Sequence, residues 1–121
     1  MTARARPWPV RLTAAAEVDF QGILRWTVEQ FGEAQAHVYA ETLSTALESL
    51  AAGPKIIGAR VRNDIAKGLF TLHVARHGRK GRHFILFRTG RDKDREVIEV
   101  LRLLHDGMDL VRHLPPTKET K

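Results

Sequence analysis

Two short apolar runs in the last third of the chain constrain its fold most. Residues 82–88 and 97–104 are rich in β-branched and aromatic side chains, which favours β-strands. Each run contains an internal arginine, Arg88 in the first and Arg102 in the second. Because an uncompensated charge on a buried sheet face is costly, we expect both arginines to reach a solvated face or to serve a binding site.

Two amphipathic helices are predicted upstream of these strands. Thr13 has the character of a helix N-cap, and the apolar residues that follow it recur at steps of three and four up to Gly32. A second apolar stripe runs from Glu33 to about Ala52 and stops at 53–54, a Gly-Pro pair. The turn between the two stripes is short, which predicts an antiparallel helix hairpin.

The remaining strand signals complete the predicted order. Residues 9–13 alternate as a half-buried first strand, and residues 69–74 form a strand that the turn 77–81 joins to the run 82–88. A second turn, 89–94, leads to the run 97–104, whereas residues 55–67 are interpreted as a basic loop or short extended chain. The predicted fold is α+β, a helix hairpin packed on an antiparallel sheet in the order β-α-α-β-β-β, with a short C-terminal helix around Asp106–Leu114.

The length of the chain limits the number of domains that it can form. The 121 residues suffice for one domain, which we place at 10–114 between a basic N-terminal tail (1–9) and a polar C-terminal tail (115–121). Its predicted core combines apolar residues of both helices and the strands, namely Phe20, Ile23, Leu43, Leu47, Leu72, Ile85, Phe87 and Val100.

Composition excludes several classes of site. The chain has no cysteine, which excludes disulfides and thiolate zinc sites, and it has no apolar run long enough for a signal peptide or membrane span. We therefore expect a soluble cytoplasmic protein. His73 and His77 are four residues apart, but along a strand that spacing is about 13 Å, too far to share one metal ion. No metal or cofactor is expected.

Charge is distributed unevenly along the chain. Residues 13–52 carry six acidic residues against one arginine, whereas residues 60–95 carry eleven lysines and arginines against three aspartates, a net charge of +8. This asymmetry predicts one acidic and one basic face, the basic face being suited to a nucleic acid or an acidic protein segment. The alternative is that the basic loops only keep a hairpin soluble.

Residues spread over positions 10 to about 114 resemble the RelE/ParE toxin superfamily, most closely its ParE-like branch. The resemblance rests on the order and spacing of these residues: 10–13, Ala16, 19–20, Ile23, 31–32, Tyr39, 68–69, 82–88, 97–105 and 108–109. It implies a type II toxin paired with a ParD-like antitoxin whose unstructured segment wraps the toxin. ParE relatives poison DNA gyrase, whereas RelE relatives cut mRNA on the ribosome. It does not imply that the chain alone binds DNA sequence-specifically.

The two branches require different chemistry. Metal-independent RNA cleavage needs a base for the 2′-hydroxyl, cations for the phosphorane and an acid for the leaving oxygen. RelE-type enzymes commonly place a tyrosine with lysines and arginines near the C-terminal strand. The one tyrosine of this chain is Tyr39, on an apolar helix stripe where we interpret it as a core residue. This departure favours the ParE-like branch, which binds a protein target without chemistry of its own.

Candidate site residues follow from this interpretation. No catalytic residue is assigned on the ParE-like reading, and the candidates for target binding are Arg88, Arg102, His105 and Asp109. On the alternative reading of a ribosome-dependent mRNA endoribonuclease, the catalytic set is Arg88, Arg102 and His105. Structural roles stay open too, since His105 can cap the last strand and Arg102 can pair with Glu99 or the chain end. The candidates for binding the antitoxin or another anionic partner are Arg60, Arg62, Arg76 and Arg82. A third alternative is an inactive module that only binds the antitoxin.

Overall fold

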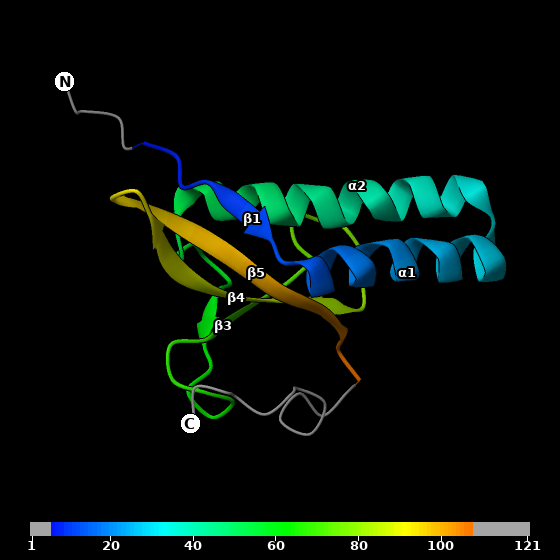
Figure 1. The fold of residues 1–121 in the computed structure, drawn as a ribbon. Coiled ribbons are helices and arrows are strands. Elements are labelled where there is room, and N and C mark those ends of the chain that lie inside the picture. Colours follow the sequence, from blue (N-terminus) through cyan, green and yellow to red (C-terminus); the bar gives the residue numbers. More distant parts are fainter. Residues whose placement is uncertain (1–5, 108–121) are drawn as a thin grey trace.

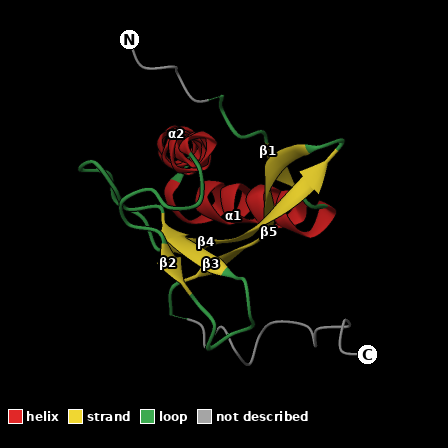
Figure 2. Ribbon diagram, turned by 90° about the vertical axis from the view of Figure 1, so that its left-hand side faces the viewer, coloured by secondary structure: helices red, strands yellow, loops and turns green. Residues whose placement is uncertain are grey.

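The computed structural model describes residues 6–107, which form two layers, a helix hairpin over a five-stranded sheet (Figure 1). Figure 2 shows both helices on one side of the sheet. In chain order the elements are β1 (Val10–Leu12), α1 (Ala14–Phe31), α2 (Glu33–Ser49), a 3-10 turn (Leu50–Ala52), β2 (Arg60–Val61), β3 (Phe70–His73), β4 (His83–Asp92) and β5 (Arg95–His105). The predicted α+β class and helix hairpin are confirmed.

The sheet is mixed, with the strand order β1-β5-β4-β3-β2. The predicted antiparallel pairing holds from β3 to β5, and β2 pairs antiparallel with β3, whereas β1 pairs in parallel with β5, from Val10 opposite Ile98 to Leu12 opposite Val100. A parallel pair needs a long crossover connection, and the helix hairpin with the following strands supplies it. The strand β2 lies within residues 55–67, for which the sequence predicts a loop or short extended chain.

Local signals fix both ends of α1. The hydroxyl of Thr13 accepts a hydrogen bond from the backbone N–H of Ala16 (3.1 Å), as an N-cap does. Gly32 has φ +92°, a conformation that glycine adopts without strain, and its N–H donates to the carbonyl of Val28 (2.9 Å). The chain therefore reverses at once into α2, as the short spacing predicted.

The hairpin between β4 and β5 is tighter than predicted. The turn placed at 89–94 consists of Lys93 and Asp94 alone, because the preceding residues continue the ladder as far as Asp92 opposite Arg95. Both turn residues have positive φ (+52° and +68°), which matches the twist of the flanking strands in a two-residue turn. The prediction ended the strands too early because it treated Thr89 and Gly90 as turn residues.

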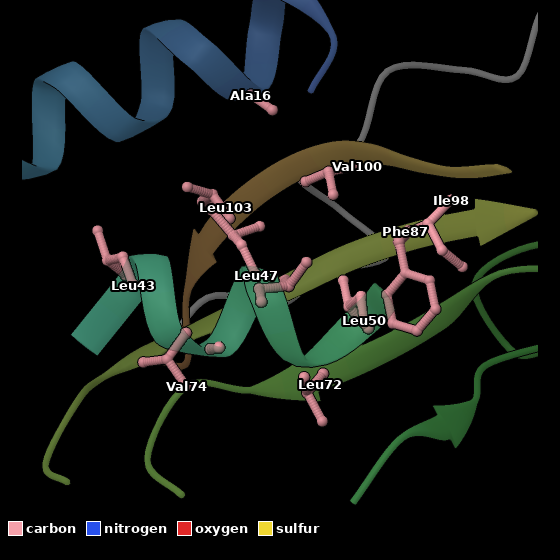
Figure 3. Packing of buried hydrophobic residues seen from close by; sticks show 12 residues of the cluster. Ala16, Leu43, Leu47, Leu50, Leu72, Val74, Phe87, Ile98, Val100 and Leu103 are labelled. Carbon is pink, nitrogen blue, oxygen red and sulfur yellow. The ribbon is translucent and has the colours of Figure 1, made fainter. Parts of the chain in front are cut away.

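The core lies between the sheet and the helices (Figure 3). Six of the eight predicted core residues are buried there, and Phe20 and Ile23 are partly buried against the same cluster. The other buried members of the cluster are Ala16, Ala46, Leu50, Val74, Ile98 and Leu103. The predicted C-terminal helix lies, except for its first two residues, outside the described part of the chain, as do Asp109, the tail 115–121 and residues 1–5.

The helix hairpin is longer than the sheet beneath it. In Figure 1 the C-terminal end of α1 and the N-terminal end of α2 extend beyond the end of the sheet at which β4 begins and β5 finishes. The candidate site forms there.

Candidate functional site

A groove of about 730 Å³ opens beneath the overhanging helices. Trp26 and Phe31 of α1 stand edge to face in it, with ring centroids 5.8 Å apart, and are 55% and 64% exposed. Exposed aromatic pairs of this kind mark binding surfaces more often than scattered apolar residues do. The remaining lining comes from α1, α2, the loop before β4 and the facing strand ends: Thr27, Gln35, Tyr39, Ala75, Arg79, Lys80, Gly81, Arg82, His83 and His105.

A hydrogen-bonded pair closes one end of the groove. The hydroxyl of Tyr39 lies 2.7 Å from Nδ1 of His83 and accepts the backbone N–H of Arg82 (2.9 Å). Burial lowers the pKa of His83 to about 4, with a further contribution from the nearby His105, so the imidazole is neutral near pH 7. Burial also raises the pKa of Tyr39. The phenol therefore keeps its proton, and it donates a hydrogen bond to Nδ1 in the tautomer of His83 that is protonated at Nε2.

This contact modifies the interpretation of Tyr39. Its ring does pack against the core, as the apolar stripe indicated. Its hydroxyl, however, reaches the groove and meets the beginning of β4. A helical stripe in the sequence gives no sign of a hydrogen bond to a residue 44 positions away.

Asp106 organises the polar side of the groove. Its carboxylate accepts a hydrogen bond from Nε2 of His73 (2.8 Å) and another from Nε of Arg82 (3.2 Å), and these two partners lower its pKa. Its backbone N–H donates to the carbonyl of Arg82 (2.7 Å). Asp106 thus ties the ends of β3, β4 and β5 together and holds the guanidinium of Arg82, whose side chain is largely exposed, beside the groove.

His105 stands next to this network. Its ring centroid is 5.4 Å from that of His83, and its Nδ1 accepts the backbone N–H of Gly107 (2.9 Å). With Nδ1 used in this way, Nε2 is the nitrogen available to a bound molecule. The capping role that the sequence left open for His105 is therefore present, and the residue also lines the groove.

The two candidate arginines of the strands lie elsewhere. Nε of Arg88 donates to the carboxylate of Glu99 (2.8 Å), the residue directly opposite on β5, which is six residues, or about 20 Å, from His105. Arg102 donates twice to Asp19 of α1 (2.8 and 3.1 Å), which raises the pKa of the arginine. The three candidate catalytic residues are therefore not brought together as one set.

Arg102 and His105 do share a second hollow. It measures about 500 Å³ and lies along the edge of β5 beside α1. Trp26, His83 and His105 line both this hollow and the groove. The two cavities are therefore neighbours on either side of these three side chains.

The four arginines proposed for an anionic partner are dispersed. Arg60 is exposed on the edge strand β2, and Arg62 forms two hydrogen bonds with Asp64 (2.9 and 2.8 Å). Arg76 donates to the carbonyl of Ile57 (3.1 Å). Of the four, only Arg82 lines the groove.

The sequence did not single out Trp26 or Gln35, because nothing in the helical pattern shows where the sheet beneath a helix ends.

Residues 6–107 contain no group of three or more His, Asp or Glu side chains arranged to hold a metal ion. The same part of the chain has no helix of the length and apolarity needed to cross a bilayer.

Comparison with known proteins places this chain in a defined class, that of small toxins from toxin-antitoxin systems. The family model described as ParE toxin of type II toxin-antitoxin system, parDE, matches residues 10–110. The chain therefore belongs to the ParE toxin family.

Two solved structures share the fold at low sequence identity. One is described as a YoeB/ParE toxin from Agrobacterium tumefaciens, with 10% identity and a TM-score of 0.55 over 80% of this chain and 96% of that chain. The other is described as the chromosomal ParDE TA system from P. aeruginosa, with 17% identity and a TM-score of 0.56 over 84% of this chain and 98% of that chain. No curated protein matches the sequence.

Proposed function

We propose that this ParE-family toxin acts in the cytoplasm by binding DNA gyrase, and that a ParD-like antitoxin neutralises it by filling the groove beneath the helix overhang. The observation that carries the proposal is the groove itself, with an exposed aromatic pair and a basic rim in one hollow. Family membership supports the pairing with an antitoxin.

The groove defines the chemistry of the neutralising segment. Trp26 and Phe31 offer apolar area to an aliphatic or aromatic side chain, and such buried aromatic anchors dominate binding energy in protein interfaces. Arg79, Lys80 and Arg82 also line the groove and favour carboxylates, although Arg79 already pairs with Glu41 and Arg82 with Asp106. The fitting partner is therefore an acidic amphipathic segment, with its apolar side toward α1.

The ion pairs of the strands favour a binding toxin over an enzyme. A phosphorane needs cations that can approach it, yet Arg88 and Arg102 each donate to a carboxylate of this same chain. A phosphate bound at either arginine would lie beside that carboxylate, whose negative charge opposes it. Binding to a protein target, by contrast, does not require either ion pair to change.

One observation favours ribonuclease activity as a second candidate function. Tyr39, His83 and His105 lie together with Arg82 at one end of the groove, so an acid-base group and a cation are adjacent. In that case His105 is the acid, because its Nδ1 accepts the N–H of Gly107 and Nε2 therefore carries the proton, and Arg82, which pairs with Asp106, is the cation. The third candidate, an inactive antitoxin-binding module, uses the same groove without toxicity.

Neutralisation is tested by antitoxin binding with matched variants of α1. The probe is the product of the reading frame next to this one, provided that this product is a small acidic protein. Trp26→Ala should weaken its binding by at least about 30-fold, since truncating an aromatic anchor costs about 2 kcal/mol or more. Val28→Ala is the control, because Val28 is exposed on α1 but does not line the groove. Equal affinities of the two variants would contradict the assignment of the groove.

A further inference from the structure

The edge of β5 is longer than the strand that pairs with it. β1 covers only Ile98 to Val100, whereas β5 continues to His105. On the side of β5 where β1 lies, no strand among the described residues pairs with the stretch from Leu101 to His105, whose other side pairs with β4. Uncovered strand edges are templates for pairing with another chain, so this stretch needs an explanation.

The outward-facing backbone groups of this stretch can be identified. The N–H of Asp106 donates to the carbonyl of Arg82, the residue directly before β4. Backbone groups alternate between the two sides of a strand in an antiparallel ladder, so Leu103 and His105 turn their N–H and C=O groups to the side away from β4. The N–H of Leu103 does point there, because it donates to the carboxylate of Asp19 (2.9 Å). On the same side, the hydroxyl of Thr13 donates to the carbonyl of Leu101 (3.0 Å).

Without these side chains the stretch would be self-complementary. If two copies met around a twofold axis at Leu103, each Leu103 N–H would face the Leu103 carbonyl of the other copy, as in a hydrogen-bonded antiparallel pair. The neighbouring surface is apolar, since Val18 and Trp26 are 68% and 55% exposed beside the same hollow. A second copy of the chain is therefore the partner that this edge fits.

We propose that Asp19 blocks this edge of β5 and so keeps it from pairing with a second copy of the chain. Its side chain is only 14% exposed, and it accepts the outward N–H of Leu103 together with two hydrogen bonds from Arg102. The arginine holds the carboxylate in place, and the carboxylate occupies the one outward N–H at the centre of the stretch. This proposal does not depend on the target or the antitoxin of the toxin.

This role of Asp19 is tested by measuring the oligomeric state of three variants in analytical ultracentrifugation. Asp19→Ala removes the acceptor, so it should form concentration-dependent dimers, whereas the wild-type chain should stay monomeric. Asp19→Asn keeps an oxygen that accepts the Leu103 N–H, and Arg102→Met keeps Asp19 itself, so both should stay monomeric. Dimers of Arg102→Met as abundant as those of Asp19→Ala would overturn the proposal, because general destabilisation would then explain them. A monomeric, folded Asp19→Ala protein would overturn it as well.

Amide hydrogen exchange of the wild-type protein tests the same point without a variant. The amide of Leu103 should exchange at least tenfold more slowly than that of His105, because Asp19 holds only the first of these two outward N–H groups. Equal exchange rates would overturn the proposal even if Asp19→Ala fails to fold.

Discussion

Acid should destabilise the folded protein through His83 before it acts on the carboxylates. The pKa of this imidazole is lowered from 6.5 to about 4 in the folded state. Between these two pH values the unfolded chain binds more protons than the folded one, so stability is complete above pH 6.5 and falls as the pH approaches 4. The full shift corresponds to about 3 kcal/mol, and because the ring is only partly buried, solvent screening reduces the expected loss to about 1–2 kcal/mol.

Urea unfolding followed by tryptophan fluorescence measures this loss at a series of pH values. His83→Asn is the matched control, since its amide oxygen can accept the hydroxyl proton of Tyr39 but does not titrate. The variant should show a flatter profile between pH 6.5 and 4.5. The lowered pKa of Asp106 causes a separate loss below about pH 4, outside that window. Parallel profiles for wild type and variant would refute the assignment of a buried neutral His83.

Three other predictions concern packing, charge and chemistry. Leu47→Ala should lower the free energy of unfolding by about 2–5 kcal/mol, because it opens a cavity in the core. Lys80→Ala, on an exposed loop, should change it by almost nothing. Equal losses in urea titrations of the two variants would contradict the placement of the core. The association rate with the acidic antitoxin should fall as salt rises, measured by stopped-flow, and a flat rate would show that the basic rim does not steer binding. His105→Ala should leave toxicity dependent only on target affinity. If the chain is instead a ribonuclease, the same change should lower the rate of mRNA cleavage by about 10²–10⁴ while the fold survives.

The fold was largely predictable because local signals agree with it. Thr13 caps α1, Gly32 separates the helices, and the apolar residues of both helices recur at helical spacing toward one core. The parallel pairing of β1 with β5 was not predictable, because it depends on contacts between segments more than 80 residues apart. The two-residue turn at Lys93 and Asp94 was missed because neither residue is glycine, although both have positive φ.

The candidate site was less predictable than the fold. His105 was identified from the sequence and lines the groove, but the arginines grouped with it form ion pairs with Asp19 and Glu99 instead. Partners of charged residues are decided by tertiary contacts, which composition and spacing do not encode. The overhang that exposes Trp26 depends on how far the helices extend past the sheet, a difference that appears only once both layers are assembled.

The most direct test of the proposed function is a supercoiling assay with purified gyrase, run beside a primer-extension assay for cleavage of ribosome-bound mRNA. We expect the purified protein to inhibit supercoiling, the antitoxin to restore it, and the mRNA to stay intact. Codon-phased mRNA cleavage that disappears in the His105→Ala protein, together with unaffected gyrase, would contradict the proposal and assign the chain to the ribonuclease branch.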